Sequence, residues 1–176
     1  LWEQTVEWCG THGDAFGPVG GTALFDLLAL RVACLLSAGA DGDAFAAVEW
    51  SLEQRHPCLS PYYARLLFLR WGLLRLHGAG GRSELADRLD AAACANRTEK
   101  ALGRVFVSDA QRDRARDASR SDPEAQFWFH WLVTCDRLGR KDASRAPGDG
   151  PLERRLPGAE RALAEVLMRR SSQVGP

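Results

Sequence analysis

The stretch that decides the fold reads Arg-His-Pro-Cys-Leu-Ser-Pro-Tyr-Tyr over residues 55–63 and runs on into a leucine-rich segment. Pro57 ends the preceding apolar segment, because proline lacks the amide hydrogen that a helix interior needs. Ser60 followed by Pro61 is typical of a helix start, since a serine hydroxyl caps free N–H groups and the first turn accepts proline. The stretch therefore predicts a corner between two helices, the second running from Pro61 to about His77.

Helical periodicity continues on both sides of this corner. We expect helices at residues 2–9, 22–37, 41–56, 61–77, 83–92, 123–139 and 157–170. Glycines and Pro18 predict a loop over residues 10–21. Residues 102–107 include the β-branched Val105 and Val107, so this segment stays open between helix and strand. Residues 108–122 place like charges four apart, which weakens an isolated helix, so we expect an exposed loop or a frayed helix there.

These elements predict an all-α protein of about seven to eight helices, stacked as antiparallel helical pairs in the manner of a helical repeat. We expect one helical domain over residues 1–139, a flexible linker at 140–156 and a C-terminal helix at 157–170 that packs on the domain. The apolar helix at 22–37 reads as central, with neighbours all round it. The predicted core anchors are Leu27, Leu28, Leu35, Leu66, Leu67 and Trp71.

The charge of the chain is zero overall but unevenly placed. Residues 1–60 hold eight acidic and two basic residues, so the remainder is basic by the same margin. This modest excess does not indicate a nucleic-acid footprint, whereas contact with charged protein neighbours fits it. The most apolar stretch, residues 23–38, is interrupted by Asp26 and Arg31, which favours a core helix over a membrane span.

The sequence contains no pattern that carries catalytic chemistry. The four histidines lack the spacing of a metal site, and the glycine-rich residues 17–21 follow no strand and include no lysine, so they do not form a phosphate cradle. The five cysteines form no C-x-x-C pair, which predicts free thiols in a reducing compartment. We therefore expect no enzyme activity, no cofactor and no metal.

Four aromatic residues fall within residues 127–131. At 100° per residue they do not share one helix face. Core packing between two neighbouring helices is one explanation, and contact with a partner protein is the other, because buried tryptophan dominates interface energy. On the second interpretation the candidate partner-binding residues are Trp128, Phe129, Arg137, Arg140 and Lys141.

Residues 55–77 resemble a stretch in the C-terminal helical domain of the Fanconi anaemia group F family. The resemblance rests on the Arg-His-Pro-x-Leu-Ser-Pro-x-Tyr run, the Leu66-Leu67 pair, Trp71-Gly72 and Leu76-His77. It implies a non-catalytic adaptor of stacked helical pairs that bridges subunits of a nuclear ubiquitin-ligase complex in interstrand-crosslink repair. It also implies that Leu59, Tyr63, Leu66 and Leu67 belong to the core of a helical pair.

A second hypothesis is a Bcl-2-like helical bundle, of cellular or viral origin, that binds a partner helix in a groove. The apolar helix at 22–37 would be its central helix. On both hypotheses we expect protein partners and a nuclear or cytoplasmic location. On neither do we expect a nucleic-acid site or contact with a membrane. Because the chain begins at Leu1 without an initiator methionine, we expect a piece of a longer protein.

Overall fold

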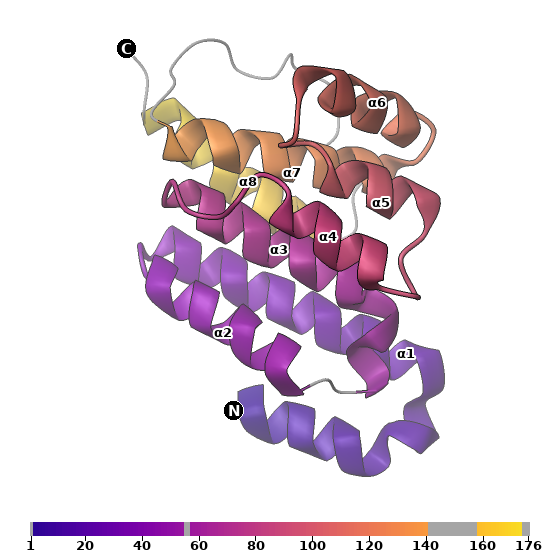
Figure 1. Cartoon of the computed structure of the whole chain (residues 1–176). Helices are drawn as coiled ribbons and strands as arrows, with labels where there is room; N and C mark the ends of the chain where they lie inside the picture. The colour runs from indigo at the N-terminus through magenta and orange to yellow at the C-terminus, as the bar shows by residue number, and fades with distance from the viewer. Residues whose placement is uncertain (1, 55–56, 141–157, 174–176) are drawn as a thin grey trace.

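The computed structural model describes residues 2–54, 57–140 and 158–173, and all regular elements within these ranges are helical (Figure 1). The all-α prediction and the expected number of helices are thereby confirmed. The elements are α1 Trp2–Ser37, α2 Asp41–Gln54, the 3-10 helix η1 Pro57–Tyr62, α3 Tyr63–Leu76, α4 Glu84–Ala91, α5 Arg97–Gly103, α6 Asp109–Ser119, α7 Pro123–Gly139 and α8 Gly158–Gln173.

Helices that follow one another in the sequence pack together, and two late helices return to early ones. The neighbouring pairs in contact include α1 with α2, α2 with α3, α4 with α5, α5 with α6, and α6 with α7. In addition α7 packs against α3, and α8 packs against α1 (Figure 1). These two long-range contacts close the helices around α3 and α7, which bury most of their side chains.

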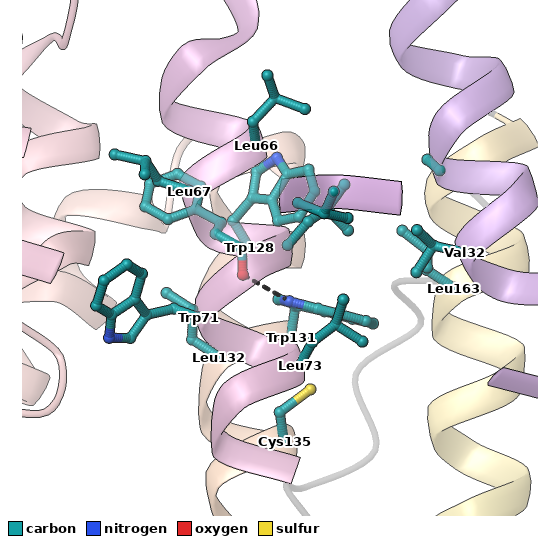
Figure 2. Packing of buried hydrophobic residues seen from close by; sticks show 14 of the residues in the cluster. Val32, Leu66, Leu67, Trp71, Leu73, Trp128, Trp131, Leu132, Cys135 and Leu163 are labelled. Atoms are coloured by element: carbon teal, nitrogen blue, oxygen red, sulfur yellow. Dashed lines mark hydrogen bonds between the residues drawn. The ribbon is translucent and has the colours of Figure 1, made fainter. Parts of the chain in front are cut away.

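Gly72 sets how closely α3 and α7 approach. A Cβ built at Gly72 would lie 2.0 Å from Trp131 Nε1, so only glycine fits there. The indole N–H of Trp131 donates a hydrogen bond to the Phe68 carbonyl of α3 over 2.9 Å, as Figure 2 shows. Gly139 repeats the close approach at the other end of α7, where a Cβ would lie 1.7 Å from the Arg75 carbonyl oxygen.

The C-terminal helix is tied to the first helical pair by Arg170. Its guanidinium donates to the Asp41 carboxylate at 2.8 and 2.5 Å and to the Leu36 carbonyl. Leu36 belongs to the last turn of α1 and Asp41 begins α2, so one side chain joins three helices. Arg170 thereby satisfies a carbonyl at a helix C-terminus, where such groups lack a partner within the helix.

The loop predicted at residues 10–21 is wrong, because α1 runs without interruption from Trp2 to Ser37. Each glycine weakens a helix by about 1 kcal/mol but keeps its N–H, so glycines do not forbid helix formation. Figure 1 shows α1 bending sharply in its indigo first part, and bends of this kind arise at proline and glycine.

The predicted core is right in most positions and wrong at Leu27. The side chains of Leu28, Leu66, Leu67 and Trp71 are buried, whereas Leu27 is 47% exposed. Leu35 is partly buried. The central position expected for residues 22–37 is not found. α1 packs against η1, α2 and α8, and over residues 21–37 one of its sides is buried while the other faces solvent.

Ser60 does not cap the helix that follows it. Ser60 and Pro61 lie inside η1, and the position before α3 is occupied by Tyr62, which makes no side-chain cap. Because the 3-10 turn runs directly into α3, the first N–H groups of α3 are not presented to a hydroxyl. Asp122 does cap α7 as its sequence predicts, accepting a hydrogen bond from the Glu124 backbone at 3.0 Å with Pro123 at the first position.

Of the two alternatives for residues 108–122, a loop or a frayed helix, the structure has a helix, α6. Ser108 caps α6 by accepting from Gln111 N, and opposite charges three apart form ion pairs along the helix. These pairs are Asp109–Arg112, Asp113–Arg116 and Asp117–Arg120. They offset the like charges four apart on which the loop prediction rested. Residues 102–107, which the sequence left open, are the end of α5 and a turn, without a strand.

Candidate partner-binding surfaces

The aromatic cluster predicted to meet a partner belongs to the core. Trp128 is 2% exposed and Phe129 5% exposed. Of the two explanations for these aromatics, burial favours core packing over a partner surface, because α7 packs against α3, α5, α6 and α8 and so has more than one core-facing side. Trp128 meets the rings of Phe25, Phe68 and Phe127 at centroid distances of 6.1, 5.7 and 4.8 Å. Consecutive aromatics on α7 therefore fill different helix–helix contacts.

Arg137 and Arg140, two of the basic residues of the same prediction, lie at the end of α7, and no exposed aromatic of the cluster accompanies them, because all four aromatics are buried. Arg137 is half-buried, and Arg140 forms an ion pair with Asp136 at 3.0 Å. Asp136 is buried and also pairs with Arg75 of α3 at 2.8 Å. Lys141 and the predicted linker, apart from Arg140, lie outside the described residues. This end of α7 thus holds an ion-pair network that joins α3 to α7.

A groove of about 950 Å³ runs along α5 and α6. The small side chains Ala95, Ala101 and Ala118 contribute to its lining and leave room above them. A capping box fixes the start of α5, since Asn96 accepts from Glu99 N at 2.9 Å and Glu99 accepts from Asn96 N at 2.7 Å. The capping box thus fixes the position at which α5 begins. We call this concavity the α5–α6 groove.

The charge of the α5–α6 groove is basic. Its lining includes four basic residues, Arg97, Lys100, Arg104 and Arg114, and two acidic residues, Asp90 and Asp117. Both acidic residues are already paired: Asp90 binds Arg104 at 2.5 Å, and Asp117 binds Arg120 at 3.1 Å.

Arg97, Lys100 and Arg114 have no ion-pair partner in the part of the chain that the structure describes. The sequence left residues 108–122 open between an exposed loop and a frayed helix, so it did not place Arg114 beside α5. The interleaved charge pattern of residues 108–122 could have indicated this set. Its opposite charges form ion pairs three residues apart along a helix, and Arg114 is not part of these pairs.

A second polar group joins four helices at the other side of α7. Arg65 of α3 donates to the Glu124 carboxylate of α7 at 2.7 Å, and Asp26 of α1 and Glu160 of α8 lie close enough to interact electrostatically. Burial raises the pKa of Asp26, Glu124 and Glu160, and the Arg65 charge opposes the rise in each case. Glu160 is 2% exposed, and its Oε2 has no hydrogen-bond partner among the described residues.

The buried titratable groups elsewhere are poorly placed for chemistry. Burial raises the pKa of the Cys135 thiol well above its ordinary value of 9.0, so this cysteine is not a reactive thiolate at neutral pH. Burial, with Arg116 nearby, lowers the pKa of His130. Among residues 2–54, 57–140 and 158–173 no three His, Cys, Asp or Glu side chains converge as metal ligands would.

None of the described helices combines the length and the apolar composition that crossing a lipid bilayer requires. Comparison with protein-family models, with curated proteins and with solved structures finds no match to this chain. The α5–α6 groove is therefore interpreted from its own geometry and charge.

Proposed function

We propose that this chain is a non-catalytic adaptor that binds an acidic segment of a partner protein in the α5–α6 groove. The observation that carries the proposal is the set of unpaired basic side chains Arg97, Lys100 and Arg114 along a groove of about 950 Å³. Opposite charge steers association and fixes the register of a bound segment, while contact with the groove floor supplies the rest of the affinity.

A protein segment suits this surface better than a nucleic acid does. The ion pairs along α6 alternate acidic and basic side chains, so the surface next to the groove is not continuously basic. A phosphate backbone carries a charge at every nucleotide and requires such continuity. An acidic peptide needs complementary charge only where its own carboxylates fall.

The proposal is tested by exchanging charge at the groove and, as a control, elsewhere. A fluorescent poly-glutamate peptide titrated with the chain reports binding directly. We expect Lys100→Glu/Arg114→Glu to weaken binding at least about tenfold and to reduce its salt dependence. The control Arg82→Glu/Arg169→Glu changes net charge equally and should bind like the unaltered chain. Equal binding by both variants, or a clear preference for double-stranded DNA over the peptide, would contradict the proposal.

Participation in a nuclear crosslink-repair complex, which the resemblance of residues 55–77 implies, stays a prediction. The described part of this stretch is η1, α3 and the residue after it, where Leu59, Leu66 and Leu67 are buried in the core. Affinity capture from nuclear extract, with the Lys100→Glu/Arg114→Glu variant as the comparison, tests it. Subunits of a Fanconi-type ubiquitin ligase should be retained by the unaltered chain and lost with the variant.

The Bcl-2-like alternative rested on residues 22–37 as a central helix surrounded by the others. In the structure α3 and α7 take the inner positions, and α1 exposes Leu27 and Leu30. No observation on the described residues favours that alternative over the adaptor.

A further inference from the structure

The solvent-facing side of α1 carries an apolar stripe. Ala23, Leu27, Leu30 and Cys34 are all exposed, with Leu27 at 47% and Leu30 at 40%. The spacing of these four residues is four, three and four, which places them along one line of the helix surface. Isolated exposed leucines are ordinary, but two leucines aligned with Ala23 and Cys34 form a continuous strip.

This spacing is that of a coiled-coil seam. If Leu27 and Cys34 take heptad position a, then Ala23 and Leu30 take position d. Two further residues then fall at the flanking positions, Asp26 at g and Arg31 at e. The helix therefore has two apolar sides: one packs in the core through Phe25, Leu28 and Val32, and the seam faces outward.

We propose that the seam binds the same seam of a second copy of the chain, with the two α1 helices side by side and parallel. In a parallel pair, position g of one helix lies beside position e of the next heptad of the other helix. Asp26 of one copy, which is partly buried near Arg65 of its own chain, would also pair across the seam with Arg31 of the other copy, and the twofold symmetry makes this pair twice. Arg31 has no ion-pair partner within the part of the chain that the structure describes.

The charges also set the orientation. An antiparallel pair would bring the two Arg31 side chains to one flank of the seam and the two Asp26 side chains to the other. Like charges at these flanks oppose that arrangement. The seam consists of only four residues, so we expect a reversible association that depends on protein concentration.

Cys34 offers a direct test, because a cysteine at position a of a parallel pair faces its own copy across the symmetry axis. A chain carrying Cys9→Ser, Cys58→Ser and Cys94→Ser retains Cys34 together with the buried Cys135. Mild oxidation should convert this chain into a disulfide-linked dimer on a non-reducing gel. A matched chain that retains the exposed Cys94 instead of Cys34 should stay monomeric under the same treatment.

Sedimentation equilibrium of the full chain, at about 1 µM to about 1 mM, measures the same association without a covalent link. We expect Leu27→Glu to weaken dimerisation at least about tenfold, and Arg31→Glu, which sets two carboxylates together, to weaken it as well. Met168→Glu changes an equally exposed apolar residue on α8 and should leave dimerisation unchanged.

Three results would overturn the proposal. The first is a monomer throughout the concentration range with no Cys34 cross-link. The second is a dimer that Leu27→Glu leaves intact in a variant with unchanged helical circular dichroism. The third is a dimer in which Cys34 does not cross-link, because this would exclude the parallel arrangement.

Discussion

At position 72 the fold has no room for a single additional carbon. A Cβ there would lie 2.0 Å from the indole nitrogen of Trp131, which is itself hydrogen bonded to α3. We expect Gly72→Ala to lower the free energy of unfolding by about 3 kcal/mol or more, because α3 and α7 must move apart.

Gly42 supplies the control for this substitution. It also lies in a helix, but no atom falls within 4 Å of a Cβ built there. Gly42→Ala should raise the free energy of unfolding by about 0.5 to 1 kcal/mol, since alanine restricts the unfolded chain. Urea unfolding of both variants measures the difference, and similar stabilities would show that the α3–α7 contact is misplaced.

The neighbours Leu27 and Leu28 differ only in which side of α1 they occupy. Leu28 is fully buried and Leu27 is 47% exposed. Leu28→Ala should cost about 2–5 kcal/mol, the range for deleting a buried leucine side chain, whereas Leu27→Ala should change stability by less than about 0.5 kcal/mol. Thermal melts of dilute protein compare the two. Equal destabilisation would mean that α1 is rotated about its axis relative to the structure.

At the scale of whole elements, two helix starts that look alike in the sequence behave differently. Asp122 accepts a hydrogen bond at the start of α7, while Ser60 lies within η1 and caps nothing. We therefore expect Asp122→Ala to cost about 1 kcal/mol, and Ser60→Ala to leave stability nearly unchanged. Chemical unfolding checks both variants, and a cost at Ser60 equal to that at Asp122 would indicate that α3 begins before Tyr63.

The contact of α1, α3, α7 and α8 should make stability depend on pH. Burial raises the pKa of Glu160 above its ordinary value of 4.5, its own backbone hydrogen bond opposes this, Asp26 and Glu124 add to the rise, and Arg65 counteracts it. The folded state therefore binds a proton more tightly than the unfolded state. Stability falls as pH rises from about 4.5 through the raised pKa of Glu160.

Glu160→Gln removes this ionisation and should raise the free energy of unfolding at pH 7 while flattening its pH dependence above 4.5. Glu165→Gln, an exposed position on the same helix, serves as the control and should not flatten it. The hydrogen bond from Arg170 lowers the pKa of Asp41 below its ordinary value of 3.8. The contribution of Asp41 to stability is therefore lost only as pH falls below 3.8, outside the pH range in which Glu160 titrates. An unaltered pH profile in Glu160→Gln would contradict the buried position of that carboxyl.

At the scale of the molecule, local signals in the sequence predicted most helices but not how they meet. Asp122 and Pro123 mark the start of α7, and Gly78, with its positive φ, follows the end of α3. Both signals depend only on residues next to the helix end. The return of α7 onto α3 depends on Gly72 facing Trp131, a contact between residues 59 positions apart. Because periodicity predicts one apolar side per helix, it did not show that α7 contacts four other helices, and Trp128 stayed open between the core and a partner-binding surface.

The candidate groove was missed for a related reason. Its basic residues come from two helices. The second of these was left open between a loop and a frayed helix, because attractive pairs three apart were not weighed against like charges four apart. Once α6 is a helix beside α5, Arg114 joins Arg97 and Lys100 on one groove. The sequence shows that residues 1–60 are acidic and the remainder basic. It does not show where on the folded surface the excess basic residues gather.

Binding of acidic protein segments in the α5–α6 groove is measured residue by residue from backbone amide chemical shifts during titration with the poly-glutamate peptide. We expect the largest, saturable changes on residues 97–104 and 111–118, and we expect them to disappear in Lys100→Glu/Arg114→Glu. Changes that centre instead on α8 or on the end of α7, or that persist in the variant, would contradict binding in this groove.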